Sequence, residues 1–167
     1  MVASASSSTV RARFCAAFVA FAATLVAFST AAAATLKSVR FGVTSPSETR
    51  VVLDIDGKAN FVMAADPEGA GALIVDLART RVDGDGARAR KAGGLVAQYA
   101  YGRSAKTGAR VVLTFAATAK VARSFVIPPG DAAPHARLVI DLVAADKKAF
   151  LASVPKRAPS LDAVIAT

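Results

Sequence analysis

Residues able to hold a catalytic metal are scarce in this sequence. The one histidine, His135, lies in the Pro-rich segment PPGDAAPHA, and the two glutamates, Glu48 and Glu68, lie in separate predicted turns. A hydrolytic zinc site needs about three protein ligands converging on one ion, with a further position open to water. We therefore predict neither a metal site nor another cofactor, and we interpret His135 as an exposed turn residue.

Other motifs for catalysis or ligand binding are incomplete or absent from the sequence. The segment DGDG at 83–86 resembles the start of a calcium loop. It lacks the third oxygen position and the bidentate glutamate at the loop's end, so a turn is the better interpretation. Neither a G-x-S-x-G nucleophile elbow nor a G-x-x-x-x-G-K-[ST] phosphate loop occurs. The sequence predicts no catalytic residues, and binding becomes the leading hypothesis.

Basic residues gather in the middle of the chain and are the first candidates for binding an anion. Guanidinium groups can hold carboxylates through two parallel hydrogen bonds. A solvated, charged linker accounts for the same composition equally well. The candidate ligand-binding residues are Arg79, Arg81, Arg88, Arg90, Lys91, Arg103 and Lys106, and the run continues to Arg110.

Two tyrosines, Tyr99 and Tyr101, fall on one side of a predicted strand in the segment QYAYG. Tyrosine stacks well against sugar faces and presents a hydroxyl group. Aromatic residues at i and i+2 more often belong to a core, however, because alternate strand residues share a face. Val39 and Phe41 occupy the matching places earlier in the chain, which favours the core interpretation.

The elements that would position these residues are short strands. Apolar and polar residues alternate in segments bounded by clusters of Gly, Pro, Ser and Asp, as in half-buried strands. The polar stretch 78–94 has little apolar periodicity. The predicted strands are 36–43, 50–56, 60–65, 72–77, 95–102, 110–116, 120–127 and 137–142.

The strand pattern occurs twice. Arg50-Val51-Val52-Leu53 recurs as Arg110-Val111-Val112-Leu113, and the segments LIVDL and LVIDL close the first and second halves. Such self-similarity indicates a repeated structural unit. We predict repeat one at about 36–77, a connection at 78–94 and repeat two at about 95–142.

Two four-stranded copies with one apolar face each can bury those faces by packing together. The sequence therefore predicts an all-β fold, a sandwich of two similar four-stranded sheets with one copy packed on the other. A short helix at 146–154, with Asp146 as its N-cap, and a linker-like tail at 155–167 follow. The side chains predicted to point into the core are Val51, Leu53 and Ile55, with Val111, Leu113 and Phe115 as equivalents.

Residues 1–34 are typical of a secretory signal peptide. Arg11 and Arg13 precede the apolar run from Phe14 to Phe28, and an A-x-A site follows at 32–34. Because that run is shorter than the roughly 20 residues of a spanning helix, we predict cleavage rather than a lasting membrane span.

Cleavage would leave a chain without cysteine, since the one cysteine is Cys15, and with a strong positive charge. The full sequence has 21 basic and 12 acidic residues, and loss of two arginines lowers the net charge from +9 to +7. Such a field favours anionic partners. Export argues against nucleic acid as that partner.

The paired RVVL segments and the closing LIVDL and LVIDL, followed by a short helix and a Pro-rich linker, resemble the AMIN domain. AMIN domains stand at the N-terminus of periplasmic N-acetylmuramoyl-L-alanine amidases and of some secretins. The resemblance covers roughly Leu36 to Val154. It implies two symmetric four-stranded sheets, a periplasmic location, sometimes at the division septum, and peptidoglycan as the ligand.

Three hypotheses about function follow. In the first, the chain is a peptidoglycan-binding and localisation module without catalytic activity. In the second, it is the N-terminal part of a zinc amidase of cell-wall hydrolysis and cell separation, whose zinc domain is absent from this sequence. In the third, a free strand edge docks a secretin or a division protein.

Overall fold

A computed structural model describes residues 33–58, 60–66, 71–83, 88–131 and 133–154. These residues belong to one compact unit, Ala31–Thr167. Nearly all of the predicted signal segment, and the whole tail 155–167, lie outside the described residues. No helix in the described ranges is long and apolar enough to cross a membrane.

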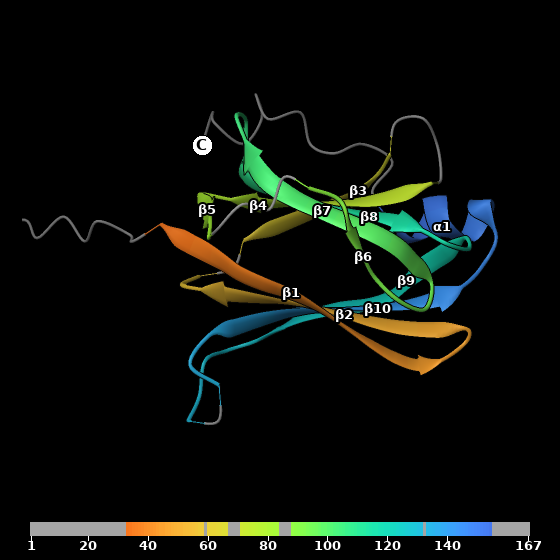
Figure 1. Ribbon diagram of the computed structural model, residues 1–167, viewed down its shortest axis with the longest axis horizontal. Coiled ribbons are helices and arrows are strands. Elements are labelled where there is room, and N and C mark those ends of the chain that lie inside the picture. Colours follow the sequence, from red (N-terminus) through yellow and green to blue (C-terminus); the bar gives the residue numbers. More distant parts are fainter. Residues whose placement is uncertain (1–32, 59, 67–70, 84–87, 132, 155–167) are drawn as a thin grey trace, which may run out of the picture. The chain divides into compact units, whose positions relative to one another are not determined.

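The described strands form two sheets, which Figure 1 shows as two layers. Sheet A has the order β5 (Thr80–Val82), β1 (Ala34–Ser45), β2 (Glu48–Asp56), β10 (Ala136–Ala144) and β9 (Ala119–Ile127). Sheet B has the order β3 (Phe61–Ala65), β4 (Ala72–Ala78), β8 (Gly108–Phe115), β7 (Val96–Ser104) and β6 (Arg90–Lys91). The all-β prediction is confirmed.

The predicted arrangement of the strands in the sheets was wrong in two respects. Each sheet has five strands, because the connection 78–94 supplies β5 and β6 as short edge strands. An edge strand can form through backbone hydrogen bonds without an apolar face. Because the strands were predicted from alternating apolar residues, these two polar strands were missed. In addition, the first half does not form one sheet and the second half the other. The chain crosses between sheets after β2, β4, β5 and β8, so each sheet combines strands from both halves.

The central pairs β2–β10 and β4–β8 bring the most apolar segments of the two halves together. Val51 lies opposite Ile140, and Leu73 lies opposite Leu113; all four are fully buried. Alternate residues of these strands face one core that both sheets share. Burial of each such side chain contributes about 1.5–3 kcal/mol. The predicted inward residues are buried, except that Phe115 is partly exposed.

The predicted helix is present as α1 (Lys147–Ser153). The Asp146 side chain accepts a hydrogen bond from the backbone N–H of Ala149, as predicted for the N-cap. Phe150 is fully buried and contacts Phe115 edge to face, with ring centroids 5.2 Å apart. The helix therefore packs against the shared core, although it has fewer than three turns.

A buried polar contact joins the two sheets. Thr49 of β2 is 2 % exposed, and its Oγ1 accepts a hydrogen bond of 2.9 Å from the backbone N–H of Leu95, just before β7. Gly94 has a φ of +63°, and a Cβ there would lie 2.2 Å from Thr49 Oγ1. A side chain at this position is therefore disfavoured by both its backbone angle and the close contact.

Candidate functional site

The seven predicted ligand-binding residues lie mostly around sheet B. All are exposed except Arg90, which is partly buried. Arg79 lies in the turn after β4, Arg81 in β5, Arg88 before β6, Arg90 and Lys91 in β6, Arg103 in β7, and Lys106 in the β7–β8 turn.

The structure brings five of these seven residues into two groups. The backbone N–H of Arg79 donates to the carbonyl of Thr107, beside Lys106, so the turn after β4 contacts the β7–β8 turn, with Arg103 at the adjoining end of β7. The turn after β4 can approach the start of β8 this closely only if residue 108 is glycine, because a Cβ on Gly108 would lie 2.7 Å from the Thr80 nitrogen. Arg90 and Lys91 instead pair with Tyr99 and Gln98 of β7, whereas Arg81 lies on β5, next to β1.

Arg90 lies beside Tyr99, its partner on β7, and contacts Tyr101. Its guanidinium carbon lies 4.8 Å from the centroid of the Tyr101 ring, within cation–π distance. The Tyr99 and Tyr101 rings are stacked 6.2 Å apart, and Phe41 of β1 lies 4.9 Å from Tyr99. Both tyrosines pack against the core while remaining partly exposed. The core interpretation is confirmed, and part of each ring stays accessible.

A depression of about 280 Å³ adjoins Tyr101 at the edge of sheet B. Its lining residues come from both faces of the sheet: Tyr101 lies opposite the buried Val111 and so points to the core side, whereas Arg110 points to the outer face, where it pairs with Asp76. Aromatic rings can stack against sugar faces, and guanidinium groups can hold carboxylates. The lining residues are Ala100, Tyr101, Gly102, Arg103, Ser104, Arg110 and Val112.

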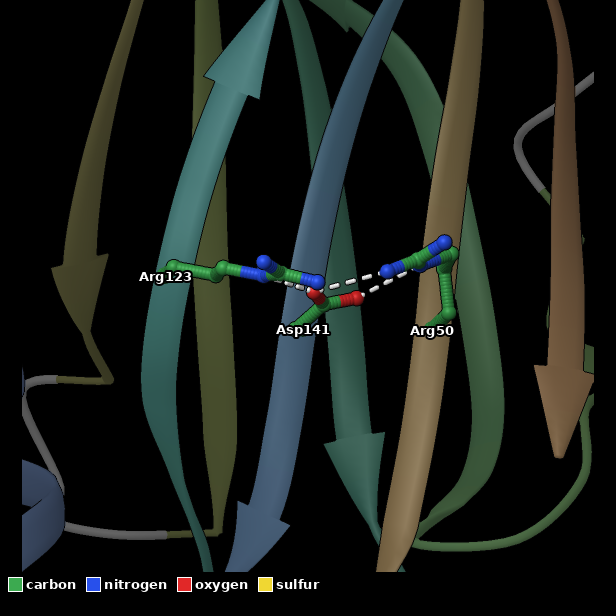
Figure 2. A network of polar contacts seen from close by, with 3 residues as sticks. All are labelled: Arg50, Arg123 and Asp141. Atoms are coloured by element: carbon green, nitrogen blue, oxygen red, sulfur yellow. Dashed lines mark hydrogen bonds and ion pairs between the residues drawn. The ribbon is translucent and has the colours of Figure 1, made fainter. Parts of the chain in front are cut away.

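A second cationic site, on the outer face of sheet A, was not predicted. Arg50 Nε and Nη2 donate to the two carboxylate oxygens of Asp141 over 2.7 and 3.0 Å, and Arg123 Nε donates a short hydrogen bond to Oδ2 (Figure 2). Hydrogen bonding by Arg50 lowers the pKa of Asp141 to about 2, and Arg123 adds to the effect. Two guanidinium groups thus share one carboxylate, which leaves the cluster with a net positive charge.

A corresponding ion pair lies on sheet B. Arg110 Nε and Nη2 donate to Asp76 over 2.7 and 2.8 Å, and the Thr107 hydroxyl lies 3.3 Å from the same carboxylate. These hydrogen bonds raise the pKa of Arg110. Arg50 and Arg110 are the first residues of the two RVVL segments, and Asp76 and Asp141 are the aspartates of LIVDL and LVIDL. The repeat itself was therefore the signal that could have revealed these pairs.

Metal ligands do not converge in the described part of the chain. No group of three or more His, Cys, Asp or Glu side chains there could hold an ion. His135 Nδ1 lies 3.8 Å from a carboxylate oxygen of Asp56, and its side chain is 37 % exposed. Asp83 at the start of DGDG pairs with Lys37 over 2.9 Å. Glu68 and residues 84–86 lie outside the described residues.

Comparison with known protein families finds none that matches this chain, and comparison with curated proteins finds no significant match.

Proposed function

We propose that this protein is an exported module that binds peptidoglycan and localises in the periplasm by doing so. The observation that carries the proposal is the contact of Arg90 with the partly exposed Tyr101, beside a depression that Tyr101 and Arg103 line. Peptidoglycan combines sugar rings with peptide stems that end in carboxylates. A partly exposed tyrosine next to guanidinium groups offers stacking for the first and ion pairing for the second.

The overall charge supports the same ligand class. After loss of the predicted signal segment the chain would carry a net charge of +7. The positive field would attract a polyanionic wall from a distance, and the local guanidinium groups would then form the specific contacts. The resemblance to AMIN domains, which extends over both halves of the chain, favours peptidoglycan among the anionic polymers of the envelope.

An internal duplication is part of this proposal. If β1 and β2 correspond to β7 and β8, and β3 and β4 to β9 and β10, the order β1-β2-β10-β9 in sheet A corresponds to β7-β8-β4-β3 in sheet B. The Arg50–Asp141 and Arg110–Asp76 pairs correspond under the same relation. We infer a pseudo-twofold axis that exchanges the sheets, with β5 and β6 as additions from the connection.

Co-sedimentation tests wall binding directly. Protein recovered from the envelope after export is mixed with purified sacculi and centrifuged, and the bound fraction is measured as salt is increased. We expect enrichment in the pellet at low salt and release at high salt, because ion pairs to exposed carboxylates are screened. A protein that stays in the supernatant at low salt would refute the proposal.

We further propose that this chain acts by binding and not by hydrolysis. Zymography of the same protein on a gel containing sacculi is expected to show no cleared band. A zone of lysis produced by the chain alone would contradict this part of the proposal without bearing on binding.

A further inference from the structure

β9 is the longest of the four strands that end a sheet. Among the described residues the other edges are formed by β5 with three residues, β6 with two and β3 with five, whereas β9 has nine. Short edge strands limit unwanted pairing with other chains, because an edge presents a row of backbone groups without partners. The length of β9 therefore makes this edge of sheet A a candidate for pairing with another chain.

The helix α1 covers only the first part of this edge. The Ser153 hydroxyl oxygen accepts a hydrogen bond of 3.0 Å from the backbone N–H of Val121. A bulge follows at Ala122, where the pairing with β10 shifts register. Beyond the bulge, Arg123–Ile127 pairs with β10 alone within the described part of the chain.

Two neighbouring apolar side chains are exposed in this uncovered part. Phe125 is 36 % exposed and Val126 40 %, and they are two of the three large apolar residues exposed in the described ranges. Successive strand residues point to opposite faces of a sheet. A partner lying on one face would cover only one of them, whereas a strand added beside β9 would cover both.

We propose that Arg123–Ile127 of β9 accepts an extended segment of a partner protein as a sixth strand of sheet A, and that this segment is acidic. Lys120 and Arg123 lie on β9, which has no acidic residue. The carboxylate that Arg123 contacts, Asp141, is shared with Arg50. In a pair of β9 strands from two copies, Lys120 and Arg123 of one copy would lie near the same two cations of the other and repel them. Charge complementarity therefore favours an acidic partner over self-pairing.

A groove beside the bulge would let the added segment continue past the end of the free edge. It has a volume of about 500 Å³ and lies between β9 and α1. Small residues of α1, Ala149 and Ala152, leave room for a chain, and Lys120 offers another contact for a carboxylate. Ala122 lines the groove and is followed in β9 by Arg123, the first residue of the uncovered part of the edge. The partner segment would therefore have an apolar part opposite Phe125 and Val126 and acidic residues toward Arg123 and Lys120.

The probe for this docking surface is a synthetic ten-residue peptide of alternating Val and Thr with two Glu at one end. Amide hydrogen exchange of the exported protein is followed by NMR with and without the peptide, in the absence of peptidoglycan. We expect exchange to slow at least about tenfold at those amides of Arg123–Ile127 that point away from β10, since only alternate N–H groups of an edge strand are open to an added strand. A peptide with Lys in place of Glu should bind about tenfold more weakly at low salt. No slowing at these amides under saturating peptide would overturn the proposal.

Matched substitutions locate the site. Val126→Lys and Phe125→Lys, which place a charge on either face of the edge, should each abolish the slowed exchange. Val62→Lys on β3, the edge strand of sheet B, should leave it unchanged. Unfolding midpoints establish that each variant is folded. If the Val126→Lys and Phe125→Lys proteins bind the peptide as tightly as the unsubstituted protein does, the assignment to β9 is wrong. The protein without peptide is also tested for dimers. If it forms dimers that the Val126→Lys substitution dissociates, the partner at β9 is a second copy of this chain and not an acidic segment of another protein.

Discussion

Arg50 and Asp141 lie opposite each other on neighbouring strands and form a two-pronged ion pair, although 91 residues separate them in sequence. Arg110 and Asp76, 34 residues apart, form the same pair on the other sheet. Each pair joins an RVVL strand to an aspartate from the other half of the chain. The ion pairs therefore mark the two central strand pairs, across which the halves of the chain are joined.

The ion pairs of Asp141 with Arg50 and Arg123 should make the free energy of unfolding depend on pH. The pKa of Asp141 is lowered from 3.8 to about 2 in the folded protein, so its contribution is complete above pH 4 and is lost as the pH falls toward 2. Because Arg50 and Arg123 are 45 and 64 % exposed, screening reduces this contribution to about 1 kcal/mol. Asp141→Asn should be less stable than the unsubstituted protein at pH 6, and the difference should narrow toward pH 2. Urea unfolding across this range measures it; a constant difference would contradict the prediction.

The two sheets should differ in their sensitivity to loss of an arginine. Arg110→Ala leaves Asp76, whose side chain is 9 % exposed, with only the Thr107 hydroxyl nearby. We expect a loss of about 2 kcal/mol, because a buried carboxylate without its guanidinium is costly. Arg123→Ala leaves Asp141 bound to Arg50 and should cost about 0.5 kcal/mol. Denaturant unfolding of both variants gives the comparison, and equal losses would refute it.

The Thr49 hydroxyl should contribute to stability through its contact with the other sheet. Thr49→Val keeps the shape of the side chain but leaves the buried N–H of Leu95 without its acceptor. We expect a loss of about 1–3 kcal/mol in the free energy of unfolding. Thr44→Val, an exposed position on the neighbouring β1, is the control and should change stability by less than about 0.5 kcal/mol. A Thr49→Val protein as stable as the control would show that the contact is dispensable.

The proposed duplication predicts similar costs at corresponding core positions. Leu53 and Leu113 are both fully buried in the same shared core, at the third position after Arg50 and Arg110 respectively. Truncation of either to alanine should cost about 3 kcal/mol, with the spread set by how far the cavity collapses. Urea unfolding of the two variants tests this. A loss below about 1 kcal/mol at one position and of about 3 kcal/mol at the other would show that the two sites are not equivalent in packing.

Wall binding should depend on the aromatic and cationic groups beside β6. Arg90→Ala and Tyr101→Ala should each weaken co-sedimentation with sacculi about three- to tenfold, through loss of stacking and of a guanidinium group. Arg123→Ala removes the same charge from sheet A and serves as the matched control. If Arg123→Ala weakens binding as much as Arg90→Ala does, and Tyr101→Ala does not weaken it, only net charge matters and the proposed site is wrong.

Several features of the fold could be predicted from local patterns. Alternation of apolar residues identified eight strands, and Asp146 followed by apolar residues at helical spacing identified α1. The edge strands β5 and β6 could not be predicted in this way, because their residues bury no continuous apolar face. The assignment of strands to the two sheets could not be predicted either. An alternating pattern shows which face of a strand is buried, but it does not specify which strand of the other half is its neighbour in the sheet.

The amino-acid sequence alone indicated most of the buried side chains of the central strands, with Phe115 as an exception, since their alternation is a local property of an extended chain. It also supplied two arginines and two aspartates at repeated positions. The tertiary structure brings Arg50 to Asp141 and Arg110 to Asp76, because the chain crosses between the sheets after β2, β4, β5 and β8. It also decided which residues surround Tyr101 and that β9 ends sheet A. Contacts between strands depend on their order in the sheet, and that order arises from the packing of the whole chain around one core.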